Sequence, residues 1–322
     1  MLRERIRTGD WVDSSRLRVY PLIYLGVSLV IMVAAVALGH GQSAFLSAAL
    51  LGWGLILLPR RPWLAGALMG VLLYKPQLGL LLPVALLAAG NRRALIGSGL
   101  SAVVLSALSY ALFGAEVWAA FFAKSEYSRL VLEQGLVPWH KMISGFAAAR
   151  MLGASVGLAW ALQALVSLTA AAAVWQVWRG PAPQPAKAAA LAAGTLLAAP
   201  LALDYDATLL GLALAALAAE GLRRGFLDWE ISTLAAVWMM PLFWRPLAQT
   251  TDIPLGVVTV MLLFWLAVRR AWIAGRQTWP PGAVSGSNEH NQVGREPWLL
   301  LGSRPSRPAR APAPRFPTCR WP

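Results

Sequence analysis

Apolar runs without a single charged residue recur through residues 20–270, and short polar segments separate them. In lipid, every backbone N–H and C=O group needs a partner within the chain, so a run of this kind folds as an α-helix. The longest runs approach the roughly 20 residues that cross a hydrocarbon core. This pattern predicts an all-α fold, a polytopic integral membrane helix bundle.

We expect about ten membrane segments, including two short half-helices. In chain order they are residues 20–38, 43–58, 63–74, 78–89, 95–113, 156–178, 188–203, 207–219, 231–244 and 255–268. They form a transmembrane domain over residues 20–272, preceded by a basic cytoplasmic N-terminus (1–19). Residues 273–322 are rich in Pro and Arg and have no sustained apolar period, which predicts a disordered cytoplasmic tail.

Composition agrees with a membrane protein, because 58% of the residues are hydrophobic and only 13% are charged. Soluble domains carry about 25% charged residues. The net charge of +14 is also typical of nucleic-acid-binding proteins. Here, however, basic residues stand in pairs between apolar runs, as topology signals do, so we expect membrane lipid and not nucleic acid as the partner. The single cysteine, Cys319, excludes an intrachain disulfide.

The apolar stretch of residues 63–89 is interrupted by Lys75, Pro76 and Gln77. It is either one long helix broken at Pro76, or two half-helices, each too short to cross the membrane, that turn back at this tripeptide. Lysine and arginine gather on the cytoplasmic side of membrane proteins. We prefer the turn because it puts every basic pair on that side, together with both termini. These pairs are Arg60/Arg61, Arg92/Arg93, Arg179/Lys187, Arg223/Arg224 and Arg269/Arg270.

The same topology collects the remaining polar clusters on the opposite, outer face. They are His40/Gln42, Lys75/Gln77, His140/Lys141 and Asp204/Asp206. A chemical site is therefore expected to open outward. The interiors of the long runs carry no charge, whereas a transporter or lipid flippase is expected to hold ionisable groups near the midplane.

Two clusters are the main candidates for chemistry. Lys75 lies between two half-helices, so it either contacts a phosphate or carboxylate or extends to the interface beside a helix break. Asp204 and Asp206 either activate a hydroxyl, ligate a metal or bind a sugar hydroxyl, or they cap the next helix, with Asp206 as its N-cap. His140 is either a general acid or base near neutral pH or a structural residue.

Several short motifs, taken in order, resemble glycosyltransferase family 87. They are LYKPQLG at residues 73–79, PLALDYD at 200–206, VPWHKM at 137–142, and Gly41-Gln42 opening a helix. The resemblance covers roughly residues 36–270. It implies a GT-C type glycosyltransferase that takes a hexose, mannose-like, from a polyprenyl-phosphate donor. The acceptor that the resemblance implies is an envelope lipid or glycan on the outer side of the inner (plasma) membrane.

The resemblance also implies roles for individual residues. It makes the acidic side chains of Asp204 and Asp206 the candidate catalytic residues. One of them would be the general base of a reaction that inverts the configuration at the anomeric carbon. Residues expected to bind substrate are Gln42, Lys75, Gln77, His140, Lys141 and Tyr205. No cofactor and no metal ligand are assigned, and the oligomeric state is not predicted.

One feature departs from the family pattern. The catalytic acid of the family lies in a long first outer loop, but here that loop comprises only residues 39–42 and contains no Asp or Glu. Activity in this chain therefore requires Asp204 or Asp206 as the base. The alternatives of an inactive member, a transporter or flippase, and a non-catalytic membrane scaffold stay open.

Overall fold

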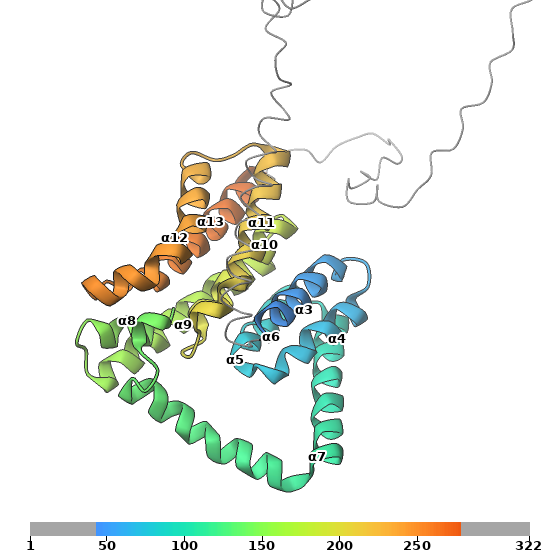
Figure 1. Cartoon of the computed structure of the whole chain (residues 1–322). Coiled ribbons are helices and arrows are strands. Elements are labelled where there is room, and N and C mark those ends of the chain that lie inside the picture. Colours follow the sequence, from blue (N-terminus) through green and yellow to red (C-terminus); the bar gives the residue numbers. More distant parts are fainter. Residues whose placement is uncertain (1–42, 278–322) are drawn as a thin grey trace, which may run out of the picture. The chain divides into compact units, whose positions relative to one another are not determined.

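The computed structural model describes residues 43–277 (Figure 1). These residues form helices and turns, and they contain no named strand. The elements are α3 (Ala44–Leu57), α4 (Pro62–Val71), η1 (Leu72–Tyr74), α5 (Pro76–Gly79), α6 (Leu82–Ala88), α7 (Arg92–Gln134), η2 (Trp139–Lys141), α8 (Gly145–Met151), α9 (Val156–Arg179), α10 (Gln184–Ala198), η3 (Asp204–Ala207), α11 (Thr208–Arg224), α12 (Glu230–Thr251) and α13 (Leu255–Gln277).

The prediction of an all-α membrane bundle is confirmed. Four helical stretches in the described part of the chain are long and apolar enough to cross a membrane: Arg92–Gln134, Val156–Arg179, Asp204–Arg224 and Leu255–Gly275. Three shorter apolar stretches accompany them: Ala44–Leu57, Pro62–Tyr74 and Pro76–Ala88. The protein is thus a multi-pass membrane protein. The first predicted span, residues 20–38, lies outside the described residues.

The hairpin at Lys75 is also confirmed. Lys75 has a non-helical backbone (φ −127°, ψ 75°), as expected for a residue that precedes proline. The start of α7 packs beside the start of α4, since a Cβ on Gly66 would collide with the backbone of Ala94. A single helix over residues 63–89 would carry residue 94 far from residue 66. The chain therefore runs out along α4 and returns along α5 and α6.

Small residues allow α4 and α7 to approach each other closely. A Cβ on Gly66 would meet the carbonyl of Ala94, and one on Gly70 would meet the carbonyl of Ser98. The two glycines are four residues apart and share one face of α4. This is the small-xxx-small packing of membrane helices, in which backbone contact replaces a hydrophobic driving force.

Helix α7 consists of two arms, which meet at a sharp bend in Figure 1. The bend is at Gly114, whose φ of 78° and ψ of 176° are accessible almost only to glycine. The expected end of the span at residue 113 is therefore correct. The second arm leads to η2 and α8.

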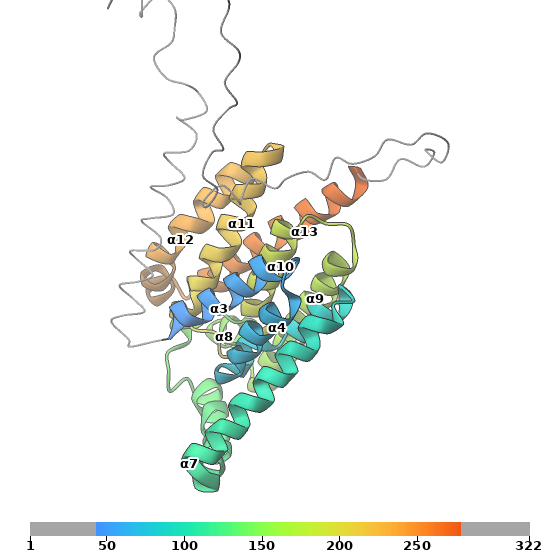
Figure 2. The ribbon, with the colours of Figure 1, turned by 90° about the vertical axis from the view of Figure 1, so that its right-hand side faces the viewer.

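Helix α10 is the centre of the core. It packs against α9, α11 and α13 (Figure 2), and its residues from Ala188 to Ala198 are all buried. Alanines dominate α10, which lets its neighbours come close. In contrast, large apolar side chains such as Leu100 on α7 and Leu168 on α9 are exposed on the protein surface. Lipid is the solvent that suits such a surface.

The basic pairs of α11 and α13 meet at one end of the bundle. Arg270 forms an ion pair with Glu230 and donates to the carbonyl of Gly225 (2.8 Å), and Arg269 donates to the carbonyl of Asp228 (2.7 Å). The predicted shared rim of these two pairs is therefore present, although its cytoplasmic orientation stays a prediction. Helix α13 continues to Gln277, so the first residues assigned to the tail, 273–277, are helical.

Candidate active site

Lys75 and Asp206 form a buried ion pair. The Lys75 Nζ lies 2.9 Å from Asp206 Oδ1, and the side chains are 12% and 2% exposed. The lysine side chain extends from the turn between α4 and α5, and its ammonium lies 5.0 Å from the centre of the Tyr205 ring. The pair joins segments 131 residues apart in the chain. It brings the two motifs singled out in the sequence into direct contact.

The backbone around Asp206 holds its carboxylate in place. Asp206 Oδ2 accepts a hydrogen bond from the Leu203 N–H (3.2 Å), and the Asp206 N–H donates to the Leu203 carbonyl (2.9 Å). Asp206 therefore stabilises the η3 turn, in which it is the third residue. The interpretation of Asp206 as the N-cap of the next helix is wrong, because the N-cap of α11 is Ala207.

Asp204 faces a different cation. Its Oδ2 accepts a hydrogen bond from Arg245 Nη1 at 3.3 Å, and the two side chains are 10% and 33% exposed. Arg245 lies in the last third of α12. Arg245 is not among the site residues predicted from the sequence. The available signal is that Arg245 is a single arginine, separated by an apolar run from the basic pairs that are predicted to be cytoplasmic. The opposite side is the unusual one for a cation.

His140 adjoins the same part of α12. Its Nε2 lies 3.0 Å from Gln249 Nε2, one helical turn beyond Arg245. The pKa of His140 is lowered, first by burial and then by the positive charges of Arg245 and Lys141. The imidazole is therefore neutral near pH 7. A neutral ring accepts a hydrogen bond or a proton at one nitrogen.

The η2 segment is tied to η3 through the backbone. The Ile143 N–H donates to the Ala202 carbonyl (2.9 Å), and Met142 pairs with Leu203 in an isolated antiparallel bridge. As a result, His140 lies near the Asp204 cluster, although the two are far apart in the sequence. The predicted convergence of three polar clusters, around residues 75, 140 and 204, is what the contacts show.

The other predicted residues have a looser relation to this cluster. The side chains of Gln77 and Lys141 are half-buried, and neither makes a hydrogen bond or ion pair to another described side chain. Gln42 and His40 lie outside the described residues. The residue after Gln42 is Ser43, whose carbonyl accepts a hydrogen bond from the Tyr74 hydroxyl (3.0 Å).

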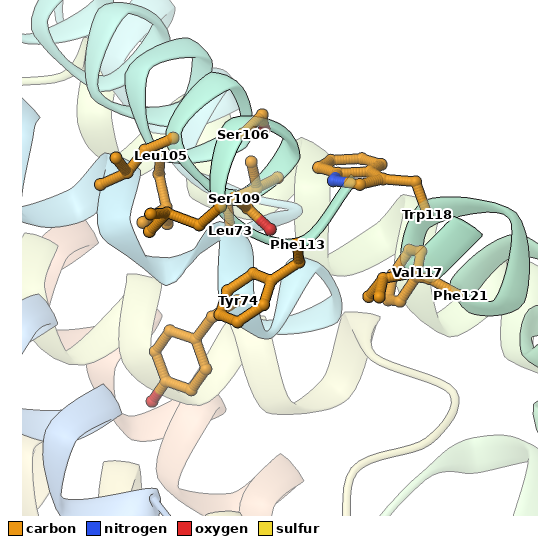
Figure 3. A pocket seen from close by; sticks show the side chains of 11 residues that line it. Leu73, Tyr74, Leu105, Ser106, Ser109, Phe113, Val117, Trp118 and Phe121 are labelled. Atoms are coloured by element: carbon orange, nitrogen blue, oxygen red, sulfur yellow. The ribbon is translucent and has the colours of Figure 1, made fainter. Parts of the chain in front are cut away.

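An apolar cavity of about 420 Å³ opens at the bend of α7. Figure 3 shows Tyr74 and Phe113 on one part of its wall and Trp118 and Phe121, from the second arm of α7, on another. One of its lining residues, Tyr74, directly precedes Lys75 in the chain. It is lined by aliphatic and aromatic side chains with a few hydroxyls, which suits a hydrocarbon chain.

A second cavity, of about 310 Å³, is bordered by His140. Its lining is polar and includes Gln134, Trp139, Arg150 and Asp252. The Trp139 indole donates to the Leu132 carbonyl (2.9 Å), and the Arg150 guanidinium stacks on the Trp139 ring at 4.7 Å. An aromatic ring with amide, carboxylate and imidazole groups suits a hydroxyl-rich ligand.

Among residues 43–277, no group of three or more His, Cys, Asp or Glu side chains is placed to hold a metal ion. The charged groups of the cluster pair with one another instead. Other ion pairs of the described residues lie at the opposite rim. There Glu220 pairs with Arg223, and Glu230 pairs with Arg270.

These observations define a multi-pass membrane protein with a charged cluster at one end of its helices, an apolar cavity that Tyr74 helps to line, and a polar cavity that His140 borders. Residues 5–203 match glycosyltransferase family 87, and the chain belongs to this family. Its general function is accordingly that of a membrane glycosyltransferase. The match includes Lys75, Gln77 and His140, and it ends directly before Asp204. It thus starts and ends earlier than the resemblance over residues 36–270.

Neither the curated proteins nor the solved structures that were compared with the chain gave a match.

Proposed function

We propose that the protein transfers a hexose, mannose-like, from a polyprenyl-phosphate donor to an envelope lipid or glycan, on the outer side of the inner membrane. The observation that carries this proposal is a cluster of two carboxylate–cation pairs, Lys75–Asp206 and Asp204–Arg245, together with an apolar cavity that is lined in part by the residue before Lys75. A lipid-linked sugar phosphate combines the same features: a hydrocarbon chain, an anionic phosphate and a polar sugar.

The apolar cavity supports a lipid donor. Its wall comes from both arms of α7 and from Leu73 and Tyr74 (Figure 3). Much of the wall, including Leu112 and Phe113, is exposed on the surface of the protein. A prenyl chain reaching this cavity from the lipid brings its phosphate toward the turn at Lys75, where the apolar lining ends.

Asp204 is the better of the two candidate bases. Both oxygens of Asp206 are engaged, one by Lys75 and one by the Leu203 N–H. Asp204 is more exposed, and within the described chain only its Oδ2 has a hydrogen-bond partner. A general base needs an oxygen within reach of the substrate proton. In this proposal Asp206 holds the turn and Asp204 acts on the substrate.

The reaction then proceeds by direct displacement. The acceptor hydroxyl loses its proton to Asp204, and its oxygen forms a bond to the anomeric carbon from the face opposite the phosphate. The bond between the anomeric carbon and the phosphate oxygen breaks, and polyprenyl phosphate leaves with the electron pair. The products are the glycosylated acceptor with inverted configuration and the prenyl phosphate.

The polar cavity beside His140 supports a hydroxyl-rich acceptor. Trp139 offers an aromatic face, and Gln134 and Asp252 offer hydrogen-bonding groups. His140 borders this cavity and lies near the Asp204–Arg245 pair, so an acceptor bound there would approach the proposed base. Lys141 and Gln77 remain substrate-binding candidates at the edges of the cluster.

The test is a transfer assay with the full-length protein in nanodiscs. Radiolabelled polyprenyl-phosphate hexoses and a bacterial lipid extract are supplied, and labelled products are separated by chromatography. We expect transfer by the parent, a loss of at least about 100-fold in Asp204→Asn, and parental activity in Asp228→Asn, an exposed acid at the opposite rim. Absence of transfer by the folded parent, or an active Asp204→Asn variant, would refute the proposed reaction.

A further inference from the structure

Two cations of the candidate site, Lys75 and Arg245, pair with its carboxylates. The contacts of each determine whether it is available to an anionic ligand. We infer that Arg245, and not Lys75, is the residue that binds the phosphate of the lipid substrate. This inference rests on the proposed function, and it names the phosphate-binding residue of the same site.

Lys75 is already neutralised. Its ammonium is within 2.9 Å of a carboxylate that is only 2% exposed, and the second oxygen of that carboxylate is fixed by the Leu203 N–H. Withdrawing Lys75 to meet a phosphate would leave the Asp206 charge buried without its partner. Breaking a buried pair in this way is strongly unfavourable, because the remaining charge has neither water nor a counter-ion. Lys75 is therefore a positioning residue that holds Asp206 and the η3 turn.

Arg245 has the opposite character. It is 33% exposed, and its contact with Asp204 is a single hydrogen bond of 3.3 Å. A guanidinium has five N–H donors in a planar fork, which matches two oxygens of a phosphate. Within the part of the chain that the structure describes, one of these donors is used by another side chain. The remaining donors are available to a ligand.

The backbone under Arg245 is well anchored. Trp244 and Ala248, its neighbours on α12, are both buried, and Gln249 contacts His140 one turn further on. The guanidinium is thus carried by a packed helix and can exchange partners without a rearrangement of the fold. Charge-assisted, bidentate contacts to phosphate are stronger than a single long hydrogen bond to a carboxylate.

This arrangement couples substrate binding to activation of the base. When a phosphate takes the guanidinium, Asp204 loses its only side-chain partner in the described residues. Its carboxylate then becomes free to accept the proton of an acceptor hydroxyl. In the absence of a donor, the same carboxylate stays paired with Arg245. The lipid phosphate therefore switches the base from a paired to an available state.

The experiment measures binding of farnesyl phosphate and of farnesol to the full-length protein in nanodiscs, by isothermal titration calorimetry. Loss of charged hydrogen bonds predicts that Arg245→Gln weakens binding of farnesyl phosphate by about 10- to 100-fold. Farnesol, which lacks the phosphate, should bind equally to both proteins. Arg245→Lys should retain part of the affinity, since it keeps the charge and loses the fork.

Arg129→Gln is the matched control, because Arg129 is an exposed arginine that also pairs with a carboxylate, that of Glu133. It should bind farnesyl phosphate as the parent does. Equal affinity of Arg245→Gln and the parent for farnesyl phosphate would overturn the inference, as would an equal loss for farnesol. The calorimetric assay measures binding and does not require transfer of the sugar. If the parent binds farnesyl phosphate through Arg245 but transfers no hexose, the proposed reaction is refuted and the role of Arg245 in binding stands.

Discussion

The Lys75–Asp206 pair gives a quantitative test of the packing described above. Replacing Lys75 by Met removes the cation and keeps a side chain of similar length. The carboxylate of Asp206, 2% exposed, then remains buried with one backbone N–H as its partner. Removing one partner of a buried pair destabilises a protein by about 3–5 kcal/mol. We expect a loss near the lower end, because Lys75 retains some contact with solvent.

The reverse change is expected to cost less. In Asp206→Asn the side-chain oxygen still accepts the Leu203 N–H, and the Lys75 ammonium, 12% exposed, still faces the Tyr205 ring. We expect a loss of about 1–3 kcal/mol, the cost of one hydrogen bond to a charged group. The double variant carries neither charge. It should therefore be more stable than the sum of the two single losses predicts.

The assay is a double-mutant cycle on the purified protein, with unfolding by SDS followed by circular dichroism. The four proteins give the coupling free energy between the two side chains. We expect a coupling of at least about 1.5 kcal/mol, well above the deviation of about 0.3–0.5 kcal/mol found for independent sites. Additive losses would refute the ion pair as the contact that joins the α4–α5 turn to η3.

Three further predictions follow from other parts of the structure. Gly66→Ala should destabilise the protein by about 1–3 kcal/mol, because the added Cβ collides with α7. Gly99→Ala has open space around it and should stabilise the helix by about 0.5–1 kcal/mol. Unfolding by SDS measures both changes in the free energy of unfolding. The pKa of His140 is lowered in the folded protein, so protonation of the ring favours the unfolded state. The contribution of His140 to stability should be constant above about pH 6.5 and fall as the pH drops from there toward the lowered pKa. His140→Gln should remove this pH-dependent loss of stability. For sidedness, in a background without the native cysteine, Thr250→Cys should react with a membrane-impermeant maleimide on intact cells and Asp228→Cys should not.

Much of the fold was predictable because the bilayer imposes so few solutions. Apolar runs bounded by charge gave helix limits close to the observed ones, as in α3 and α9. The turn at Lys75 followed from proline chemistry combined with the charge bias of the loops. The predicted helix ends were less accurate where an apolar segment continues into an amphipathic one without a clear boundary. Helix α12 runs seven residues beyond the expected limit at residue 244, and α10 ends at Ala198 instead of 203.

The candidate site was predictable only in part. Charge placement brought Lys75, His140 and the two aspartates to one face. The structure pairs Lys75 with Asp206, and His140 contacts Gln249, one helical turn from the Arg245 that pairs with Asp204. Which cation pairs with which carboxylate was not predictable, because it depends on how the η3 turn orients side chains two residues apart. Arg245 was missed for a related reason: it directly follows an apolar run, and only the packing of α12 beside η2 and η3 gives it a role.

The difference between the two aspartates shows what the turn contributes to function. The two aspartates are the first and third residues of η3. The carboxylate of Asp206 points inward, to Lys75 and the backbone, whereas that of Asp204 points toward α12. A site with two equivalent acids would offer two competing bases. Here burial and hydrogen bonding fix one acid as structure and leave the other adjustable through Arg245. In the proposed reaction, Asp204 takes the place of an acid in the first outer loop, and this requires the Asp204–Arg245 contact to open when a lipid phosphate binds.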